Sequence, residues 1–428
     1  MNDNVNPPAE PHDPYAVFRL RDFRLYLTGR LVSATGQQMF AMAIGWELYE
    51  RTGSALALGM VGLTQVLPMY LFTLPAGHFA DNYNRKKIIL LMTLVIALAN
   101  LGLTAVSALG VPVAWFYLCL FVASSARTFL MAATASFMPQ LVPRKIFSQA
   151  VTWNVSAFQT ASIVGPMLAG VVIGHLHHAA WVYALNMMAA IVFCGLLVRV
   201  NYEQPTTVPQ AMNLQTLLNG FRFVFSTRII LGLITLDMFA VLLGGATALL
   251  PIYAKDILFV GPTGLGMLQA ALPLGSVCCA FVVAHRRPLQ KAGHAMLWAV
   301  TVFGLATIAF GLSHWFWFSV AMLFACGAAD NVSVVVRHTL VQMLTPDEKR
   351  GRVSAVNNLF IGTSNELGEF ESGGVAHLCG KYLGCTAATG AVIAAVSGGI
   401  GTILVVGAVA VLWPEIRKYG RLDSHSTG

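Results

Sequence analysis

Charged residues are almost absent from most of this chain, and their absence constrains the fold more than any motif does. Only 10% of the 428 residues are Asp, Glu, Lys or Arg, and 57% are hydrophobic, whereas about a quarter of a soluble domain is charged. Inside a bilayer each backbone amide must be paired within its own segment, which favours helices of about 20 apolar residues. The sequence therefore predicts an all-α membrane protein with twelve transmembrane helices, near 24–48, 55–78, 88–109, 112–138, 149–174, 179–199, 229–254, 263–284, 294–312, 315–343, 353–377 and 386–412.

Basic residues in the predicted connectors alternate between a rich side and a poor side of the membrane. Twenty Lys and Arg residues fall on one side, whereas the other side has only Arg51, Lys255 and Lys381. Cytoplasmic loops of membrane proteins carry the excess of Lys and Arg. The alternation predicts an even number of spans with both termini in the cytoplasm, because one missing helix would scramble it.

An internal repeat predicts two six-helix halves. Four residues of the fifth helix recur in the eleventh at an offset of 203, namely Asn154, Thr160, Gly165 and Gly170 as Asn357, Thr363, Gly368 and Gly373. Gln65 of the second helix has a counterpart in Gln269 of the eighth. The predicted organisation is a disordered cytoplasmic tail (1–22), an N-terminal half (23–199), a cytoplasmic linker (200–228), a C-terminal half (229–413) and a cytoplasmic tail (414–428).

The connector after the second helix resembles the signature loop of the major facilitator superfamily, G-x-x-x-D-R-x-G-R-R/K. The matching residues are Gly77, Asp81, Arg85 and Lys86. Asn82 and Asn84 stand where the family has Arg and Gly. The resemblance covers essentially the whole chain. It implies the major facilitator fold and transport by alternating access, and it implies that this loop stabilises the outward-open state.

Other segments are similar to particular branches of that superfamily. The fifth helix contains Gly165, Pro166 and Gly170, similar to the Gly-Pro motif of antiporters. The stretches 236–240 and 364–373 resemble the enterobactin-exporter-like and macrolide-efflux-like branch, drug:proton antiporter type 3. This resemblance implies efflux of a small compound in exchange for protons.

Nine ionisable residues fall within the predicted spans, although a charge at the bilayer centre costs on the order of 3 kcal/mol on insertion scales. They are Arg30, Glu47, Arg127, Asp237, Asp330, Arg337, Glu366, Glu369 and Glu371. Six of the nine lie on the first, fourth, seventh and tenth helices, which line the central cavity in the superfamily. We therefore expect a polar cleft, and these nine residues are the candidates for proton coupling.

Asp237 and Asp330 are the leading candidates among them. A buried carboxylate such as Asp237 is the most economical proton carrier in the second half. Arg127 and Asp330 align in the repeat near the middle of their helices, and Arg337 lies two turns beyond Asp330 on the same helix face. The alternative for these carboxylates is a structural ion pair across the halves.

The eleventh helix has three carboxylates close together, with Glu366 and Glu369 on one face and Glu371 beside it. Three ionised carboxylates at this spacing would repel one another, so at least one is expected to be protonated or paired. The stretch is either a coupling or cation-binding site or a polar seam that packs against glycine-rich helices.

Candidates for the substrate cavity are amides and large apolar side chains near the same helices, namely Gln37, Gln38, Phe40, Met238 and Phe239. Glu47 and Arg30 lie near opposite ends of the first helix. Their alternative role is to extend toward the membrane interface, as long charged side chains do.

Neither a metal site nor a cofactor site is expected. The seven cysteines show no metal-ligand spacing, and a nucleotide-binding G-x-x-x-x-G-K-S/T motif is missing from the sequence. We expect no enzymatic activity and no nucleic-acid partner. The sequence favours a monomeric, proton-coupled exporter of a small amphipathic compound (drug, antibiotic or siderophore) in the bacterial inner membrane. The alternatives are an importer or facilitator of a lipid or nutrient, and a membrane-embedded ligand sensor.

Overall fold

The computed structural model describes residues 13, 15–202, 221–286, 291–346 and 349–418. All regular structure in these ranges is helical. Most of the predicted tails and linker lies outside the described residues, at 1–12, 203–220 and 419–428. The domain bounds and the disorder expected of residues 1–22 therefore stay predictions.

The first group of packed helices comprises α1 (Arg21–Thr52), α2 (Ala55–Asn82), α3 (Arg85–Leu109), α4 (Ala114–Leu141), α5 (Phe147–Leu176) and α6 (Ala180–Val198). Gly53 and Gly110, with φ of 58° and 65°, end α1 and α3 in the left-handed conformation that glycine adopts without strain. Asn84, which replaces the family's glycine, caps α3 by accepting a hydrogen bond from the Lys87 backbone N–H at 3.1 Å.

The second group comprises α8 (Arg228–Leu243), α9 (Leu250–Ile252), α10 (Gly261–Ala284), α11 (Ala292–Gly311), α12 (Phe316–Leu344), α13 (Arg350–Leu383), α14 (Ala387–Leu412) and α15 (Pro414–Lys418). Short 3-10 and π-helical segments, η3 (Ala246–Leu249) and η4 (Tyr253–Ile257), flank α9.

The predicted span 229–254 is not one continuous α-helix, because α8 ends at Leu243. The chain then passes so close to α13 that a Cβ added at Gly245 would lie 2.6 Å from the Gly368 carbonyl oxygen. This break depends on packing against a helix more than 100 residues away in the sequence. The apolar length of the segment could not reveal it.

In the described part of the chain, ten helical segments are long and apolar enough to cross a membrane. Two further long helices, α1 and α13, have 32 and 34 residues but carry many of the charged and polar side chains that the sequence singled out. The structure thus shows an all-helical fold with ten candidate spans, and the total of twelve spans stays a prediction.

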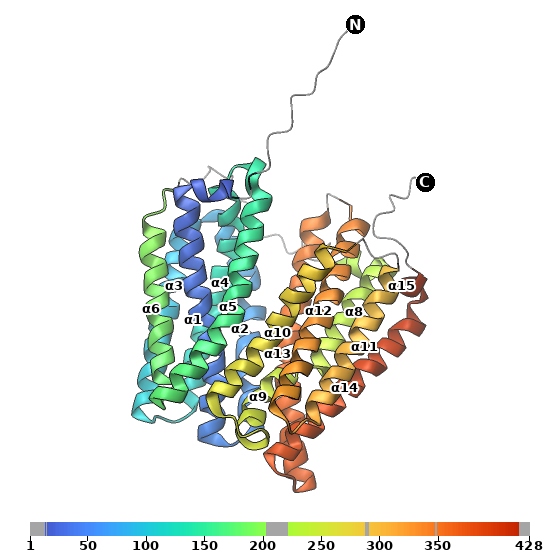
Figure 1. Ribbon diagram of the computed structural model, residues 1–428. Coiled ribbons are helices and arrows are strands. Elements are labelled where there is room, and N and C mark those ends of the chain that lie inside the picture. The colour runs from blue at the N-terminus through green and yellow to red at the C-terminus, as the bar shows by residue number, and fades with distance from the viewer. Residues whose placement is uncertain (1–12, 14, 203–220, 287–290, 347–348, 419–428) are drawn as a thin grey trace.

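The two groups pack against each other at one end only. We call the end at which α1 begins and α14 ends the terminal face, and the opposite end the distal face (Figure 1). One hydrophobic core contains residues of both groups, such as Ile44, Leu58 and Leu265, all toward the distal face. Toward the terminal face each group has a core of its own, and Figure 1 shows the groups diverging there.

Two pairs of helices form the contact between the groups, α2 with α13 and α5 with α10. Their backbones approach closely because glycine occupies the contact points. A Cβ added at Gly62 would lie 2.3 Å from the Glu366 carbonyl oxygen, and one at Gly266 would lie 2.4 Å from the Pro166 carbonyl oxygen. Small residues allow such close approach of helices in membranes.

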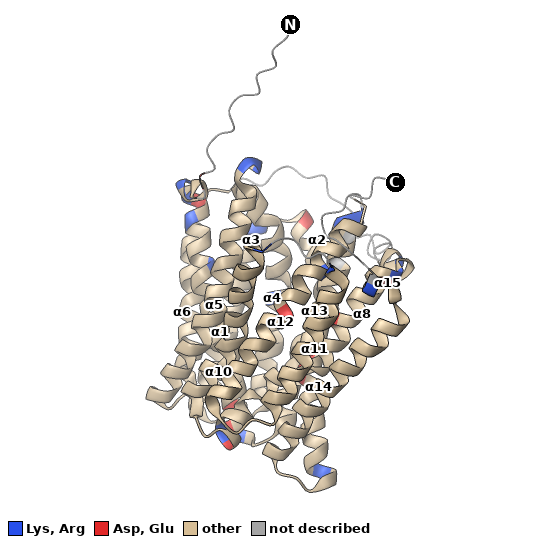
Figure 2. Cartoon of the chain, turned by 45° about the vertical axis from the view of Figure 1, so that its right-hand side comes forward, with Lys and Arg blue, Asp and Glu red and all other residues tan. Residues whose placement is uncertain are grey.

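Basic residues gather toward the terminal face, as Figure 2 shows. The distal face has few by comparison, among them the residues 51, 255 and 381 noted above. The distribution has the asymmetry that the positive-inside rule associates with a cytoplasmic face.

Candidate functional site

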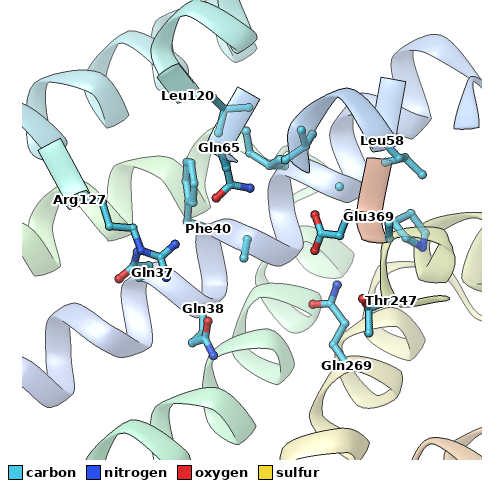
Figure 3. Close-up of a pocket in the computed structure, with 16 residues that line it drawn as sticks. Gln37, Gln38, Phe40, Leu58, Gln65, Leu120, Arg127, Thr247, Gln269 and Glu369 are labelled. Carbon is cyan, nitrogen blue, oxygen red and sulfur yellow. The ribbon is translucent and has the colours of Figure 1, made fainter. Parts of the chain in front are cut away.

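A cavity lies between the two groups, and both contribute polar side chains to it (Figure 3). Its empty volume is about 670 Å³, and this volume includes the part that is open to solvent. The polar lining residues are Gln37, Gln38, Gln65 and Arg127 from the first group and Thr247, Gln269 and Glu369 from the second. Apolar side chains, including Phe40, Ile44 and Leu58, fill the rest of the wall.

Arg127 of α4 is the cation of this cavity. When the Gln37 amide presents its oxygen to Arg127, that oxygen accepts hydrogen bonds from Arg127 Nε at 3.0 Å and Nη1 at 3.2 Å. Arg127 also borders a second cavity inside the first group, together with Asn100 and Asn186. A neutral amide therefore holds its guanidinium at the cavity wall.

Glu369 of α13 lies across the cavity from Arg127, beside Gln269 and Thr247 (Figure 3). Arg127 interacts electrostatically with both Glu369 and Glu366, although no direct ion pair joins them in the part of the chain that the structure describes. The cavity thus has a guanidinium group on one wall and a carboxyl group on the opposite wall, and each wall belongs to a different helix group.

The carboxylates of α13 do not act as one set. Glu369 lines the cavity, and the helix backbone at Glu366 packs against Gly62 of α2. Glu371 accepts a hydrogen bond from Ser372 at 3.3 Å and does not line the central cavity. This helix packs on glycines of α2 and presents one carboxylate to the cavity. The coupling or cation-binding role of the three glutamates stays a prediction.

Asp237 and Arg337 form an ion pair within the second group. Arg337 Nη1 of α12 lies 2.6 Å from Asp237 Oδ2 of α8, and the two side chains are 3% and 6% exposed. Asp330 lies near this pair, in a small separate cavity that Asp237 also lines. The structure therefore brings these three candidates together, but away from the central cavity and within one half.

The charged residues of α1 lie outside both cavities. Glu47 pairs with Arg51 at 2.6 Å and accepts a hydrogen bond from Ser107 Oγ at 2.7 Å. This arrangement ties α1 to α3 near the distal face. Arg30 lies nearer the terminal face, and its buried Nε has no hydrogen-bond partner among the described residues.

Three of the five predicted substrate-cavity residues, Gln37, Gln38 and Phe40, line the central cavity. Met238 and Phe239 of α8 do not line it, and Phe239 is exposed on the helix surface. Gln269 and Thr247 were not proposed from the sequence. The repeat offered a signal for one of them, because Gln269 is the counterpart of Gln65 and both amides face the same cavity.

The signature-loop residues tie the terminal ends of the first group together. Arg85 Nε donates to the Ala80 carbonyl at 3.0 Å and Nη1 to the Ser136 carbonyl at 3.3 Å. Lys86 Nζ donates to two carbonyls at the end of α6, at 2.7 and 3.0 Å. Gly77 has open space where a Cβ would lie, and Asp81 makes further contacts within the described part of the chain.

The antiporter-like residues of α5 lie where that helix contacts two others. A Cβ at Gly165 would lie 2.6 Å from Gln38 Cβ of α1, and one at Gly170 would lie 2.6 Å from the Pro262 carbonyl oxygen of α10. Pro166 itself packs against Gly266 of α10. Gln38 also donates to Ser162 of α5 at 2.6 Å, so this motif connects the cavity wall to the contact between the groups.

Among the described residues, three polar side-chain contacts join the two groups. The Tyr49 hydroxyl of α1 donates to the Asp256 carboxylate in η4. Tyr70 Oη and Thr363 Oγ1 lie 2.7 Å apart, between α2 and α13. Thr263 Oγ1 donates to the Gly170 carbonyl at 3.3 Å. Sequence reasoning did not find them, because each depends on how the two groups dock.

The described residues contain no group of three or more His, Cys, Asp and Glu side chains positioned to hold a metal ion. All seven cysteines are free thiols.

Comparison with known proteins identifies a family over nearly the whole chain. A family model described as "Transmembrane secretion effector" matches residues 12–418. The chain is 27% identical over 402 residues to the enterobactin exporter EntS of Citrobacter koseri, covering 93% of each protein. It is 25% identical over 410 residues to EntS of Escherichia coli, covering 95% of each.

Solved transporters share the fold. A bacterial homologue of the human lysosomal transporter Spinster, inward-facing and occupied, superimposes with a TM-score of 0.71 at 14% identity, covering 95% of this chain and 99% of that one. The peptide transporter POT in complex with sulfate gives a TM-score of 0.71 at 11% identity, with the same coverage.

Proposed function

The chain belongs to the transmembrane secretion effector family of the major facilitator superfamily, and from that membership we propose that it is a proton-coupled exporter of a small amphipathic compound. It is a multi-pass integral membrane transporter and not an enzyme. The proposal adds the direction, the coupling ion and the substrate class, and it places the protein in the bacterial inner membrane as a monomer with twelve spans.

The central cavity carries the proposal. Its walls belong to two helix groups that share a core toward the distal face and have separate cores toward the terminal face. Alternating access requires such a site between two bodies that rock against each other. A site of this kind is accessible from one side at a time, which supports transport over simple ligand sensing.

The charge distribution supports an inward-facing assignment. If the basic terminal face is cytoplasmic, as the positive-inside rule predicts, the closed distal face lies outside. The cavity would then load from the cytoplasm, which is the first step of efflux. The names of the relatives, enterobactin exporters, agree with this direction.

The chemistry of the cavity supports an amphipathic substrate. Phe40, Ile44 and Leu58 offer apolar surface, while Gln65 and Gln269 offer amides that donate or accept hydrogen bonds. A drug, an antibiotic or a siderophore combines aromatic surface with such polar groups. Protons supply the energy in this scheme, and carboxylates buried in the second half bind and release them.

The test is accumulation in cells with and without the protein, measured for catecholate siderophores, macrolides and lipophilic dyes. The proposal expects at least one compound to accumulate less in expressing cells, and expects a protonophore to abolish the difference. Higher accumulation in expressing cells would instead make the protein an importer. Efflux that persists after the proton gradient collapses would overturn proton coupling.

Two matched variants connect the result to the cavity. Arg127→Gln removes a charge from the cavity wall, and Lys145→Gln removes the same charge from an exposed site. A charge-assisted hydrogen bond contributes about 1.5–3 kcal/mol, so loss of Arg127 should lower efflux of an acidic compound about tenfold or more. Lys145→Gln should leave efflux unchanged. If the two variants lower efflux equally, the loss does not come from the cavity.

A further inference from the structure

A small cavity inside the second helix group, bordered by two aspartates, is separate from the central cavity. Asp237 of α8 and Asp330 and Ser333 of α12 border it, and Val300 and Phe303 of α11 close it. None of these residues lines the central cavity. Asp330 and Ser333 are one turn apart on the same face of α12, so both side chains point to the same space.

Two of the polar groups around this cavity have no partner among the described residues. Asp330 makes no direct hydrogen bond or ion pair there. Ser333 is 3% exposed, and its buried Oγ is without a hydrogen-bond partner as well. Buried polar groups are normally satisfied, so an unsatisfied hydroxyl beside a carboxylate points to a missing binding partner.

The charges around the cavity do not cancel. Arg337 is the only cation that pairs there in the described ranges, and it is already bonded to Asp237 at 2.6 Å. The second carboxylate, Asp330, therefore leaves one negative charge without compensation. An uncompensated charge in a low-dielectric interior is unfavourable, and binding one proton at Asp330 makes the whole group neutral.

The helices that pack on α12 provide no further counter-charge. These are α8, α10 and α11. On α8 the charged residues are Asp237 and Arg228 at its first position, and α10 has none. Apart from hydroxyl groups, α11 has one titratable side chain, that of His294 near its first turn. On α12 itself the remaining groups are Arg337, its neighbour His338 and the Cys326 thiol.

We propose that Asp330 is the proton-binding residue of the second half, with the Asp237–Arg337 pair as a fixed, neutral neighbour. This inference rests on the proposed function and refines it. One proton forms an O–H bond on the Asp330 carboxylate, and the cavity changes from one net negative charge to none.

The experiment is infrared difference spectroscopy on the full chain in liposomes as the pH is varied. A protonated carboxyl group has a carbonyl band that the ionised group lacks. We expect a band that appears on acidification in the wild type and is lost in Asp330→Asn. Glu50→Gln, which removes an exposed carboxylate outside the cavity, should keep it. Ser333→Ala should also keep the band, because the proton is on the Asp330 carboxylate.

The outcomes separate this inference from the proposed function. Infrared spectroscopy needs no transported compound, so a titrating Asp330 in a protein that exports nothing would support the inference and overturn the exporter. Proton-driven efflux that survives Asp330→Asn, or an unchanged band in that variant, would overturn the inference and leave the exporter standing. A thermal unfolding midpoint that rises with Na⁺ at constant pH in the wild type, but not in Asp330→Asn, would show that Asp330 binds sodium and not a proton. That result would also overturn the inference. Folding of each variant is checked by its thermal midpoint.

Discussion

At the scale of single residues, the Asp237–Arg337 pair shows how a charge is tolerated in an apolar helix group. Both side chains are almost fully buried, and their oxygen and nitrogen atoms are 2.6 Å apart. Sequence reasoning favoured Asp237 as the most economical proton carrier. Its neutralising partner now makes it a poorer candidate than Asp330, because a paired carboxylate has less to gain from a proton.

We expect Asp237→Asn to destabilise the protein by roughly 3–5 kcal/mol, because it leaves the Arg337 charge buried and unpaired. The double variant Asp237→Asn with Arg337→Gln should recover most of this loss, since no net charge then remains. Thermal unfolding in detergent measures both. If the single variant unfolds at the wild-type temperature, the ion pair contributes nothing to stability and the assignment of roles to the two aspartates loses its basis.

At the scale of helices, glycine determines which surfaces meet. Gly62 of α2 faces the α13 backbone, whereas Gly195 of α6 has open space where its Cβ would lie. The blocking atom at Gly62 is the Glu366 carbonyl oxygen, which cannot rotate away as the tip of a flexible side chain can.

Gly62→Ala should therefore destabilise the protein by about 1–3 kcal/mol through overpacking, and should weaken the closed distal face. Gly195→Ala is the matched control and should be neutral or stabilising by up to about 1 kcal/mol, since alanine favours a helix. Thermal midpoints of the two variants measure the difference. Equal midpoints would mean that α2 and α13 separate easily at this point.

The helices themselves could largely be predicted, because apolar length determines a membrane helix without reference to its neighbours. The break after Leu243 could not, since it depends on Gly368 of a distant helix. The candidate site divides in the same way. Gln37 and Gln38 stand out as amides in an apolar helix, but Thr247 reaches the cavity only through that break. The repeat alone could have indicated Gln269.

At the scale of the whole molecule, two bodies share one core at the distal face. Charge counting predicted the two sides of the membrane, and the repeat predicted two halves. Neither could predict which end is closed, because the docking of the halves is a conformational state and the same sequence must support at least one other. The polar contacts made by Tyr49, Tyr70 and Thr263 belong to this state.

A reversible cross-link tests whether the distal contact must open during transport. A Cβ added at Gly174 of α5 would lie 2.7 Å from Thr263 Oγ1 of α10, and a Cβ and the partner sulfur are at a similar separation in a disulfide with ordinary geometry. We expect Gly174→Cys with Thr263→Cys to form a disulfide on oxidation and to hold the distal face closed. Transport should then be lost and should return on reduction.

Each single cysteine variant provides the control, because it contains the same seven native thiols without the designed pair. Oxidation should leave transport by the single variants close to that of the wild type. Binding from the terminal face should survive in the cross-linked protein, since the cross-link only holds together the distal face, where the groups already share a core. If the cross-linked protein still moves its compound across the membrane, the two groups do not separate at α5 and α10 during the cycle. The proposal that the two halves rock against each other would then be wrong.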